Sequence, residues 1–304
     1  MRTALLVPCY NAHRFLPRLR TQVDRLQPAF DEVLLADDAS TDDTAALAES
    51  LGFRILRLPE NRGPGGARNA LAQSATAEWI HFHDVDDELA PDYLARVQPA
   101  ATAETDVVFH FVDFISEETR APQIRWSFDP AKLAADPTDH LLRHPLPIYA
   151  AFLRRKAWVE VGGFDEQQRC FEDGDFCFRL AVAGARIACV PEVLEWSLRH
   201  PSGISADQRY CFTCRVAYLE SYLATMPARL RPAIACEAEH AATMLLRFGD
   251  GTGASRALAL CHQLGHQVPA TAHPLLRVLR PILPAATLLQ WQDRWRQSRQ
   301  RHSP

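Results

Sequence analysis

Four acidic residues fall within five positions directly after the apolar segment Trp79–His83: Asp84, Asp86, Asp87 and Glu88. Carboxylates this close together repel one another unless a cation lies among them. Mg²⁺ and Mn²⁺ bind in proteins through one or two carboxylates and complete their coordination with phosphate oxygens of a substrate. The segment therefore predicts a divalent-metal and nucleotide site, with a solvated acidic loop as the alternative.

A second acidic pair, Asp37 and Asp38, ends the apolar segment Glu32–Ala36. Ser40 or Asp42 can cap a following helix, but capping leaves the adjacent acidic pair unexplained. Two carboxylates at the end of a buried segment are costly unless they bind hydrogen-bond donors. We expect those donors to be nucleotide groups, such as a base N–H or ribose hydroxyls.

The segment Asn61–Asn69 is rich in glycine and precedes a helical pattern. A glycine at a helix start, such as Gly65, lets the backbone approach a phosphate or nucleotide closely. The dinucleotide-binding fingerprint fails because Arg68 stands in place of its third glycine, and no Gly-Lys-Ser/Thr follows to make a P-loop. A plain turn with Pro64 at the first helical position stays open beside nucleotide binding.

These polar segments need a scaffold that brings them together. Apolar segments alternate with amphipathic ones through about residue 115, which predicts βαβ units and a largely parallel sheet of the α/β class. In such sheets ligands bind beyond the carboxyl ends of the strands, where the polar segments fall. The expected strands are Thr3–Pro8, Glu32–Ala36, Phe53–Leu58, Trp79–His83, Asp106–Val112 and Ile148–Leu153, and the expected helices are Arg14–Leu26, Asp42–Leu51, Pro64–Ser74, Pro91–Val97, Arg155–Val161 and one from Glu172.

Seven motifs occur in one order along residues 1–205. Pro-x-Tyr-Asn, Asp-Asp-x-Ser-x-Asp-x-Thr, Asn-x-Gly-x-x-x-Ala-Arg-Asn and Asp-x-Asp-Asp each follow a successive expected strand. Arg154–Lys156 with Val161–Glu166, then Glu172-Asp173, then Arg199–Ser205 come after them. In these motifs the chain resembles the family-2 glycosyltransferases, whose GT-A fold is a Rossmann-like nucleotide-binding sheet flanked by helices.

The resemblance implies an inverting transfer of a sugar from a nucleotide-diphosphate donor, with UDP favoured, to a hydroxyl acceptor, aided by Mn²⁺ or Mg²⁺. Such chemistry needs a carboxylate to take the acceptor's proton and a cation to offset charge on the departing diphosphate. Ordinary first-turn helix acids are the alternative for Glu172 and Asp173. The assignment places Pro8, Tyr10, Asn11, Asp37, Asp38, Gly65, Arg68, Asp84 and Asp86 at the nucleotide sugar, Asp86, Asp87 and His200 at the metal, and Asp173 with Glu172 at the catalytic centre.

The pattern becomes wholly helical after about residue 205, which predicts a GT-A catalytic domain at 1–205 and a helical region at 206–304. The tail Pro274–His302 interleaves arginines with leucines and with Trp291 and Trp295. Leu288 and both tryptophans share one helical face by their spacing. Peripheral contact with an anionic membrane and simple packing on the chain's own helices both stay open.

Bulk composition narrows the classes of function. The 304 residues carry 33 basic and 37 acidic side chains, so no basic field indicates nucleic acid. The amino-terminal apolar run is too short for a signal peptide, and no run of 18 apolar residues occurs. Both observations favour a location in the cytoplasm.

Two other classes of function compete with sugar transfer. A nucleotidyltransferase would need a glycine-rich loop near the amino terminus. A catalytically weak nucleotide-sugar-binding protein would have lost part of the acidic set.

Two histidines, His81 and His83, alternate on one face of the strand expected at Trp79–His83. This spacing is more typical of packed or hydrogen-bonded side chains than of metal ligands. The identity of the sugar, the acceptor and the linkage is left open by the motifs.

Overall fold

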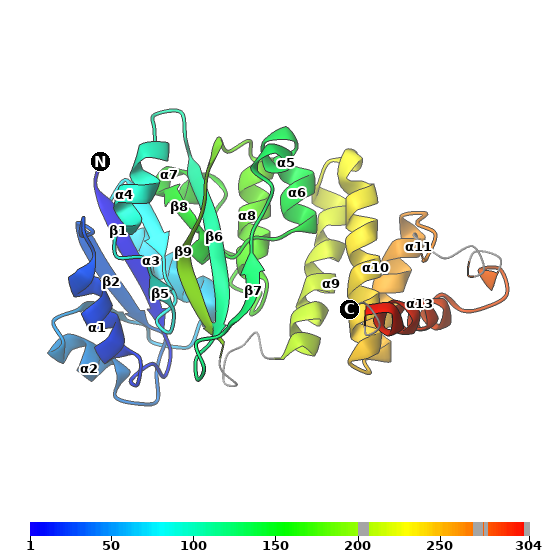
Figure 1. Ribbon diagram of the computed structural model, residues 1–304, viewed down its shortest axis with the longest axis horizontal. Coiled ribbons are helices and arrows are strands. Elements are labelled where there is room, and N and C mark those ends of the chain that lie inside the picture. The colour runs from blue at the N-terminus through cyan, green and yellow to red at the C-terminus, as the bar shows by residue number, and fades with distance from the viewer. Residues whose placement is uncertain (200–206, 270–275, 277–278, 301–304) are drawn as a thin grey trace. The chain divides into compact units, whose positions relative to one another are not determined.

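The computed structural model describes residues 1–199, 207–269, 276 and 279–300. The chain divides into two compact units, Met1–Gly203 and Ile204–Pro304. The first is an α/β unit and the second is helical (Figure 1). His200, expected at the metal, lies outside the described residues, as do parts of the tail 274–302.

A single sheet of nine described strands forms the centre of the first unit. The strands are β1 (Thr3–Cys9), β2 (Glu32–Asp37), β3 (Arg54–Arg57), β4 (Trp79–Phe82), β5 (Glu88–Leu89), β6 (Val107–Ser116), β7 (Pro122–Trp126), β8 (Ala151–Arg154) and β9 (Ile187–Arg199). Their order is β3-β2-β1-β4-β8-β6-β9-β5, with β7 paired to β6. Pairing is parallel from β3 to β4 and again between β6 and β9, whereas β8, β5 and β7 run antiparallel to their neighbours. The predicted α/β class is confirmed.

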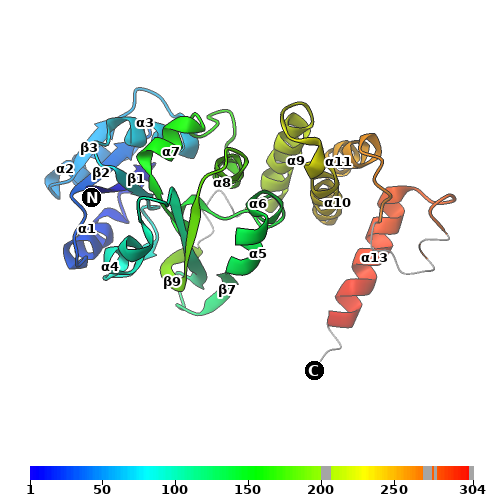
Figure 2. The same cartoon turned by 90° about the horizontal axis from the view of Figure 1, so that it is seen from above.

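Helices cover both faces of this sheet, as the view from above makes clear (Figure 2). Leucines and alanines of α1, α2 and α4 join one buried cluster, and those of α3, α7 and α8 join the cluster on the opposite face. This burial of one apolar stripe per helix is what holds the strand ends in register. The helices are α1 (Leu16–Arg25), α2 (Thr44–Ser50), α3 (Gly63–Ser74), α4 (Tyr93–Val97), α5 (Pro130–Ala135), α6 (Pro137–Arg143), α7 (Arg155–Glu160) and α8 (Glu172–Val182).

One expected strand is only partly formed. Residues Ile148–Ala150 make a 3₁₀ turn, and the strand β8 begins at Ala151. The turn packs Ile148 into the core while the chain changes direction to run antiparallel to β4. The long strand β9 has no counterpart among the expected elements.

The second unit packs α9 (Gln208–Thr225), α10 (Arg231–Arg247), α11 (Gly251–Gln263) and α13 (Ala285–Gln300) around its own apolar core. An ion pair from Arg247 to Asp293 ties α13 to α10. Leu288 is 1% exposed, whereas Trp291 and Trp295 are 47% and 42% exposed. The helical face expected to gather Leu288 and the two tryptophans is therefore not uniformly exposed, because Leu288 is buried while both tryptophans reach solvent. Within the described residues, every helix falls short of the length or apolarity needed to cross a bilayer.

Candidate active site

The loops after β1 and β2 are joined by side-chain hydrogen bonds. Asn11 Oδ1 accepts a hydrogen bond from the Thr41 N–H at 2.8 Å, and Ser40 Oγ accepts one from the Asn11 N–H at 2.9 Å. Pro8 is half-buried beneath them, and Tyr10 is 52% exposed. Asn11 thus has a positioning role, while the Tyr10 ring is open to a planar ligand.

Asp38 is buried at the end of β2 and accepts two backbone hydrogen bonds. The N–H groups of Arg62 and Gly63 donate to its two carboxylate oxygens at 2.7 and 2.8 Å. Burial raises the pKa of Asp38, and the two N–H donors partly oppose that shift. Its neighbour Asp37 accepts the Ser40 N–H at 3.3 Å. For Asp38, the backbone at the start of α3 therefore supplies the hydrogen-bond donors that the sequence analysis expected from a nucleotide.

Helix α3 also packs closely against the turn that precedes α8. A Cβ on Gly65 would lie 3.3 Å from the Asp165 carbonyl oxygen and from the Phe164 Cβ. Asn69 Nδ2 donates to the Phe164 carbonyl at 2.9 Å, and Asn69 Oδ1 accepts the Phe164 N–H at 2.8 Å. Close approach to the chain itself accounts for the glycine at position 65 without a ligand.

Arg68 links two loops of the site from within α3. Its Nη1 lies 2.6 Å from Glu172 Oε1, and its Nη2 lies 2.8 Å from Asp84 Oδ1. The side chain is buried, and burial alone would lower its pKa. The charges of Asp84, Glu172 and Asp173 outweigh this and raise the pKa above its usual value. Arg68 is thus a fixed cation between the loop after β4, here called the acidic loop (residues 84–88), and the start of α8.

Asp173 lies near that cation in the first turn of α8, whereas the ion pairs of Arg68 in the described part of the chain are with Asp84 and Glu172. Burial raises the pKa of Asp173 to about 7, and the charge of Glu172 adds to the effect. Arg68 and the Gly174 N–H, which donates to Asp173 Oδ1 at 2.7 Å, pull the pKa the other way. A carboxyl group with a pKa near 7 can accept a proton at neutral pH, as a general base requires.

The acidic loop after β4 contains one deeply buried carboxylate. Asp87 Oδ1 accepts the Leu198 N–H of β9 at 2.8 Å, so this residue holds the loop to the neighbouring strand. Burial raises the pKa of Asp87 well above its usual range, with further contributions from Asp86 and Asp84. Asp86 and Asp84 are only half-buried. Three carboxyl groups thus lie close together here, and a bound cation would relieve the repulsion among their charges.

Tyr149 joins this group although no sequence motif marks it. Burial raises the pKa of its hydroxyl well above the usual value, and the charges of Asp87, Asp84 and Asp173 add to it, against a hydrogen bond with Ser197. The hydroxyl therefore stays protonated and can donate among the carboxylates. Tyr149 lies in the 3₁₀ turn before β8, a place that periodicity alone does not distinguish.

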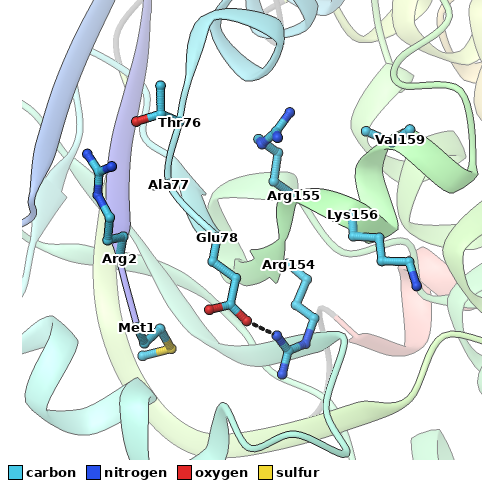
Figure 3. A pocket seen from close by; sticks show the side chains of 9 residues that line it. All are labelled: Met1, Arg2, Thr76, Ala77, Glu78, Arg154, Arg155, Lys156 and Val159. Carbon is cyan, nitrogen blue, oxygen red and sulfur yellow. Dashed lines mark hydrogen bonds and ion pairs between the residues drawn. The ribbon is translucent and has the colours of Figure 1, made fainter.

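A hollow in the first unit lies away from these residues (Figure 3). Its lining includes Arg2, just before β1, and Glu78, just before β4. Glu78 pairs with Arg154 there. This is the amino-terminal edge of the parallel strands, opposite the edge at which ligands bind in such sheets. It has no part in the candidate active site.

Comparisons with known proteins show which family and which relatives this chain resembles. The family described as glycosyl transferase family 2 matches residues 4–160. The succinoglycan biosynthesis protein ExoO of Rhizobium meliloti is 32% identical over 205 residues, which cover 61% of this chain and 57% of that protein. A pre-mycofactocin glycosyltransferase of Mycobacterium tuberculosis is 26% identical over 198 residues, covering 62% of this chain and 41% of the relative. The chain thus spans about half the length of these relatives.

Two solved structures share the fold. The mannosyltransferase PcManGT from Pyrobaculum calidifontis, in complex with GDP-Man and Mn²⁺, has a TM-score of 0.58 at 17% identity, covering 97% of this chain and 87% of the other. S. aureus TarS 1-349, in complex with UDP-GlcNAc, has a TM-score of 0.56 at 15% identity, covering 89% and 95%. The expected GT-A fold is confirmed.

Proposed function

The chain belongs to glycosyl transferase family 2, and we propose that it transfers a sugar from a nucleotide-diphosphate sugar to a hydroxyl group with inversion at the anomeric carbon. The observation that carries this proposal is Asp173, a carboxyl group with a pKa of about 7 held beside the acidic loop at the strand ends. A base of that pKa can take the acceptor proton at neutral pH as the new bond forms.

The donor is proposed to be a UDP-sugar. The solved structures of the same fold carry UDP-GlcNAc and GDP-Man, so a nucleotide sugar is the shared ligand class. In this chain Tyr10 offers an exposed ring for a base, and the loops around Asn11 and Asp38 are held in place by hydrogen bonds. The relatives named for succinoglycan and pre-mycofactocin support a role in glycan or glycoconjugate synthesis.

A divalent cation fits the residues of the acidic loop. Asp84, Asp86 and Asp87 offer hard carboxylate oxygens within four positions, which is the donor set that Mn²⁺ and Mg²⁺ take. Such an ion supplies charge stabilisation for the departing diphosphate. Arg68 orients Asp84 toward α3, and Asp87 is anchored to β9. Asp86, which is half-buried on the same loop, is proposed as the principal protein ligand.

Calorimetry with UDP, in Mn²⁺ or in EDTA, tests the donor and metal together. We expect tight binding only with the metal and a marked loss in Asp86→Asn. Equal affinity under both conditions would exclude metal-assisted donor binding. A panel of UDP-sugars and GDP-mannose with hydroxyl acceptors then separates transfer from hydrolysis of the donor alone. Binding without either reaction would indicate a nucleotide-sugar-binding protein.

A further inference from the structure

A second group of ionisable side chains lies buried apart from Arg68 and Asp173. His81 on β4 and His110 on β6 flank Tyr93 of α4, with ring centroids 4.4 and 5.3 Å from the tyrosine. Glu195 of β9 completes the group, and all four side chains are 0% exposed. The proposed sugar transfer gives these residues no task.

Hydrogen bonds constrain the protonation of both imidazoles. His81 Nδ1 lies 3.0 Å from the Ala151 carbonyl oxygen, and His110 Nδ1 lies 3.0 Å from the Phe111 carbonyl oxygen. Because a carbonyl oxygen only accepts, the Nδ1 of His110 carries the hydrogen and its Nε2 has a lone pair. His81 Nδ1 also lies 3.0 Å from the Tyr93 hydroxyl, which can accept from it or donate to it, so a cation at Nε2 would select the tautomer with the hydrogen on Nδ1. Burial lowers the pKa of His81 well below its usual value and that of His110 to about 4, so both rings are neutral.

Three polar atoms of these side chains then face one another, and all three are acceptors when the hydrogen of His81 is on Nδ1. His81 Nε2, His110 Nε2 and a carboxylate oxygen of Glu195 lie within 4.8 Å of one another. None of His81 Nε2, His110 Nε2 and Glu195 Oε2 has a hydrogen-bond partner in the described part of the chain. Buried polar atoms without partners typically cost about 1–3 kcal/mol each, so such an arrangement calls for something that accepts lone pairs.

We propose that His81, His110 and Glu195 hold a structural zinc ion. The His81 Nε2 to Glu195 Oε2 distance is 3.2 Å, close to the edge of roughly 3.3–3.4 Å expected of a tetrahedron with metal–ligand bonds of about 2.0–2.1 Å. Neutral imidazoles with one carboxylate form a ligand set that zinc accepts. The ion would join β4, β6 and β9 at the centre of the sheet.

The surroundings of the site support this assignment. Zinc-bound histidines usually donate their other N–H to a carbonyl or carboxylate, and each Nδ1 here lies 3.0 Å from a carbonyl oxygen. Glu195 Oε1 in turn accepts a hydrogen bond from His83 Nδ1 at 2.9 Å, and His83 Nε2 accepts one from Gln22 Nε2 at 2.8 Å. The spacing of His81 and His83 alone favoured packed histidines. The ligand set emerges only when later strands bring His110 and Glu195 beside them.

A proton is the alternative to a metal. Burial raises the pKa of Glu195 well above its usual range, so without a cation this carboxyl group would be neutral. Its O–H could then donate to His81 Nε2, or, with the Tyr93 hydroxyl donating to His81 Nδ1, the Nε2–H of His81 could donate to Glu195 Oε2 across 3.2 Å. Either bond would satisfy two of the three atoms but leave His110 Nε2 without a partner. The two explanations therefore differ in metal content.

Metal analysis of the full chain, purified from zinc-containing medium and dialysed against EDTA, tests the proposal. We expect about one zinc per chain in the wild type and in Asp86→Asn, because a buried structural site exchanges slowly whereas Mn²⁺ or Mg²⁺ on the acidic loop is removed. His110→Gln should lose the zinc and lower the unfolding temperature. Zinc retained in folded His110→Gln would contradict the ligand assignment.

If His110→Gln fails to fold, measurements on the wild type alone test the zinc proposal. X-ray absorption at the zinc edge should give nitrogen and oxygen neighbours only, including two imidazoles. A wild-type chain free of zinc as purified, which also takes up neither Zn²⁺ nor Co²⁺ on refolding, would overturn the proposal and favour the proton. The result is independent of the donor and of sugar transfer.

Discussion

Asp173→Asn should abolish proton transfer while stabilising the fold. Asparagine has the same shape and keeps the Oδ1 acceptor for the Gly174 N–H, which donates at 2.7 Å in the wild type. It cannot take a proton from an acceptor hydroxyl. Losing a general base typically costs about 10²–10⁴-fold in turnover, and we expect kcat to fall within that range with donor affinity little changed.

The stability gain follows from the pKa of Asp173. Burial and the charge of Glu172 raise it from 3.8 to about 7, which disfavours the ionised form by roughly 4 kcal/mol. A carboxyl group whose pKa is raised in the folded state stabilises the fold fully at pH below 4. That contribution is lost as pH rises through about 7. At pH 8, Asp173→Asn should therefore unfold at higher denaturant concentration than the wild type, with the difference vanishing near pH 4.

Urea unfolding at pH 4, 6 and 8, paired with transfer rates over the same range, provides the assay. Asp175→Asn is the matched control, because Asp175 on the same helix pairs with Arg179 at 2.8 Å and its loss should weaken the fold. Wild-type kcat should rise with pH and level off above about 7. Normal turnover in Asp173→Asn would remove Asp173 from the mechanism. Equal stability at pH 8 would refute the argument from burial.

Three further predictions concern the supports of the site and the second unit. Arg68→Met should destabilise the fold by about 3–5 kcal/mol in urea unfolding, since it leaves the buried carboxylate of Glu172 and the half-buried one of Asp84 uncompensated, and Arg68→Lys should recover little because one ammonium cannot bond both. Gly163→Ala should destabilise more than Gly162→Ala: both glycines have positive φ, but only at Gly163 would a Cβ lie 2.5 Å from an asparagine oxygen, so an equal loss would contradict this reasoning. Replacing Trp291 and Trp295 with serine should reduce sedimentation with anionic vesicles, most clearly at low salt; a wild type that does not pellet would assign α13 to packing alone.

The ends of the first strands and the order of the first elements could be predicted from the sequence. Hydrophobic periodicity and the position of polar residues along the chain indicate both. The strands expected at Thr3–Pro8 and Trp79–His83 differ from the observed ones by one residue at the carboxyl end. Strand β9 was not predicted from the sequence, because Pro191 and Glu192 interrupt its apolar pattern. In the structure His110 pairs with Val190 and Phe111 with Val193, so those two residues form a bulge that the strand passes through.

Side-chain partners were the part that the sequence could not supply. Strand-end position together with the family motifs placed Asp84, Arg68 and Glu172 at one site, and they lie in one ion-pair network. The same reasoning assigned Asp38 and Gly65 to a nucleotide, although backbone N–H groups and the turn at Phe164 already account for much of what they do. Position along a strand indicates which residues meet, but the hydrogen bonds that each makes depend on the whole fold.

The hydrogen bonds of Arg68 distinguish two neighbouring acids that the motif treats alike. Glu172 and Asp173 both begin α8, and either carboxylate could be imagined as the base. Glu172 accepts a hydrogen bond from Nη1 of Arg68 at 2.6 Å, while Asp84 accepts one from Nη2 at 2.8 Å. Asp173 has only the more distant attraction of the same guanidinium, and repulsion from Glu172 contributes to its raised pKa. A single buried arginine thus pairs with one acid and leaves the next one ready to accept a proton, which makes Asp173 the better candidate for the base.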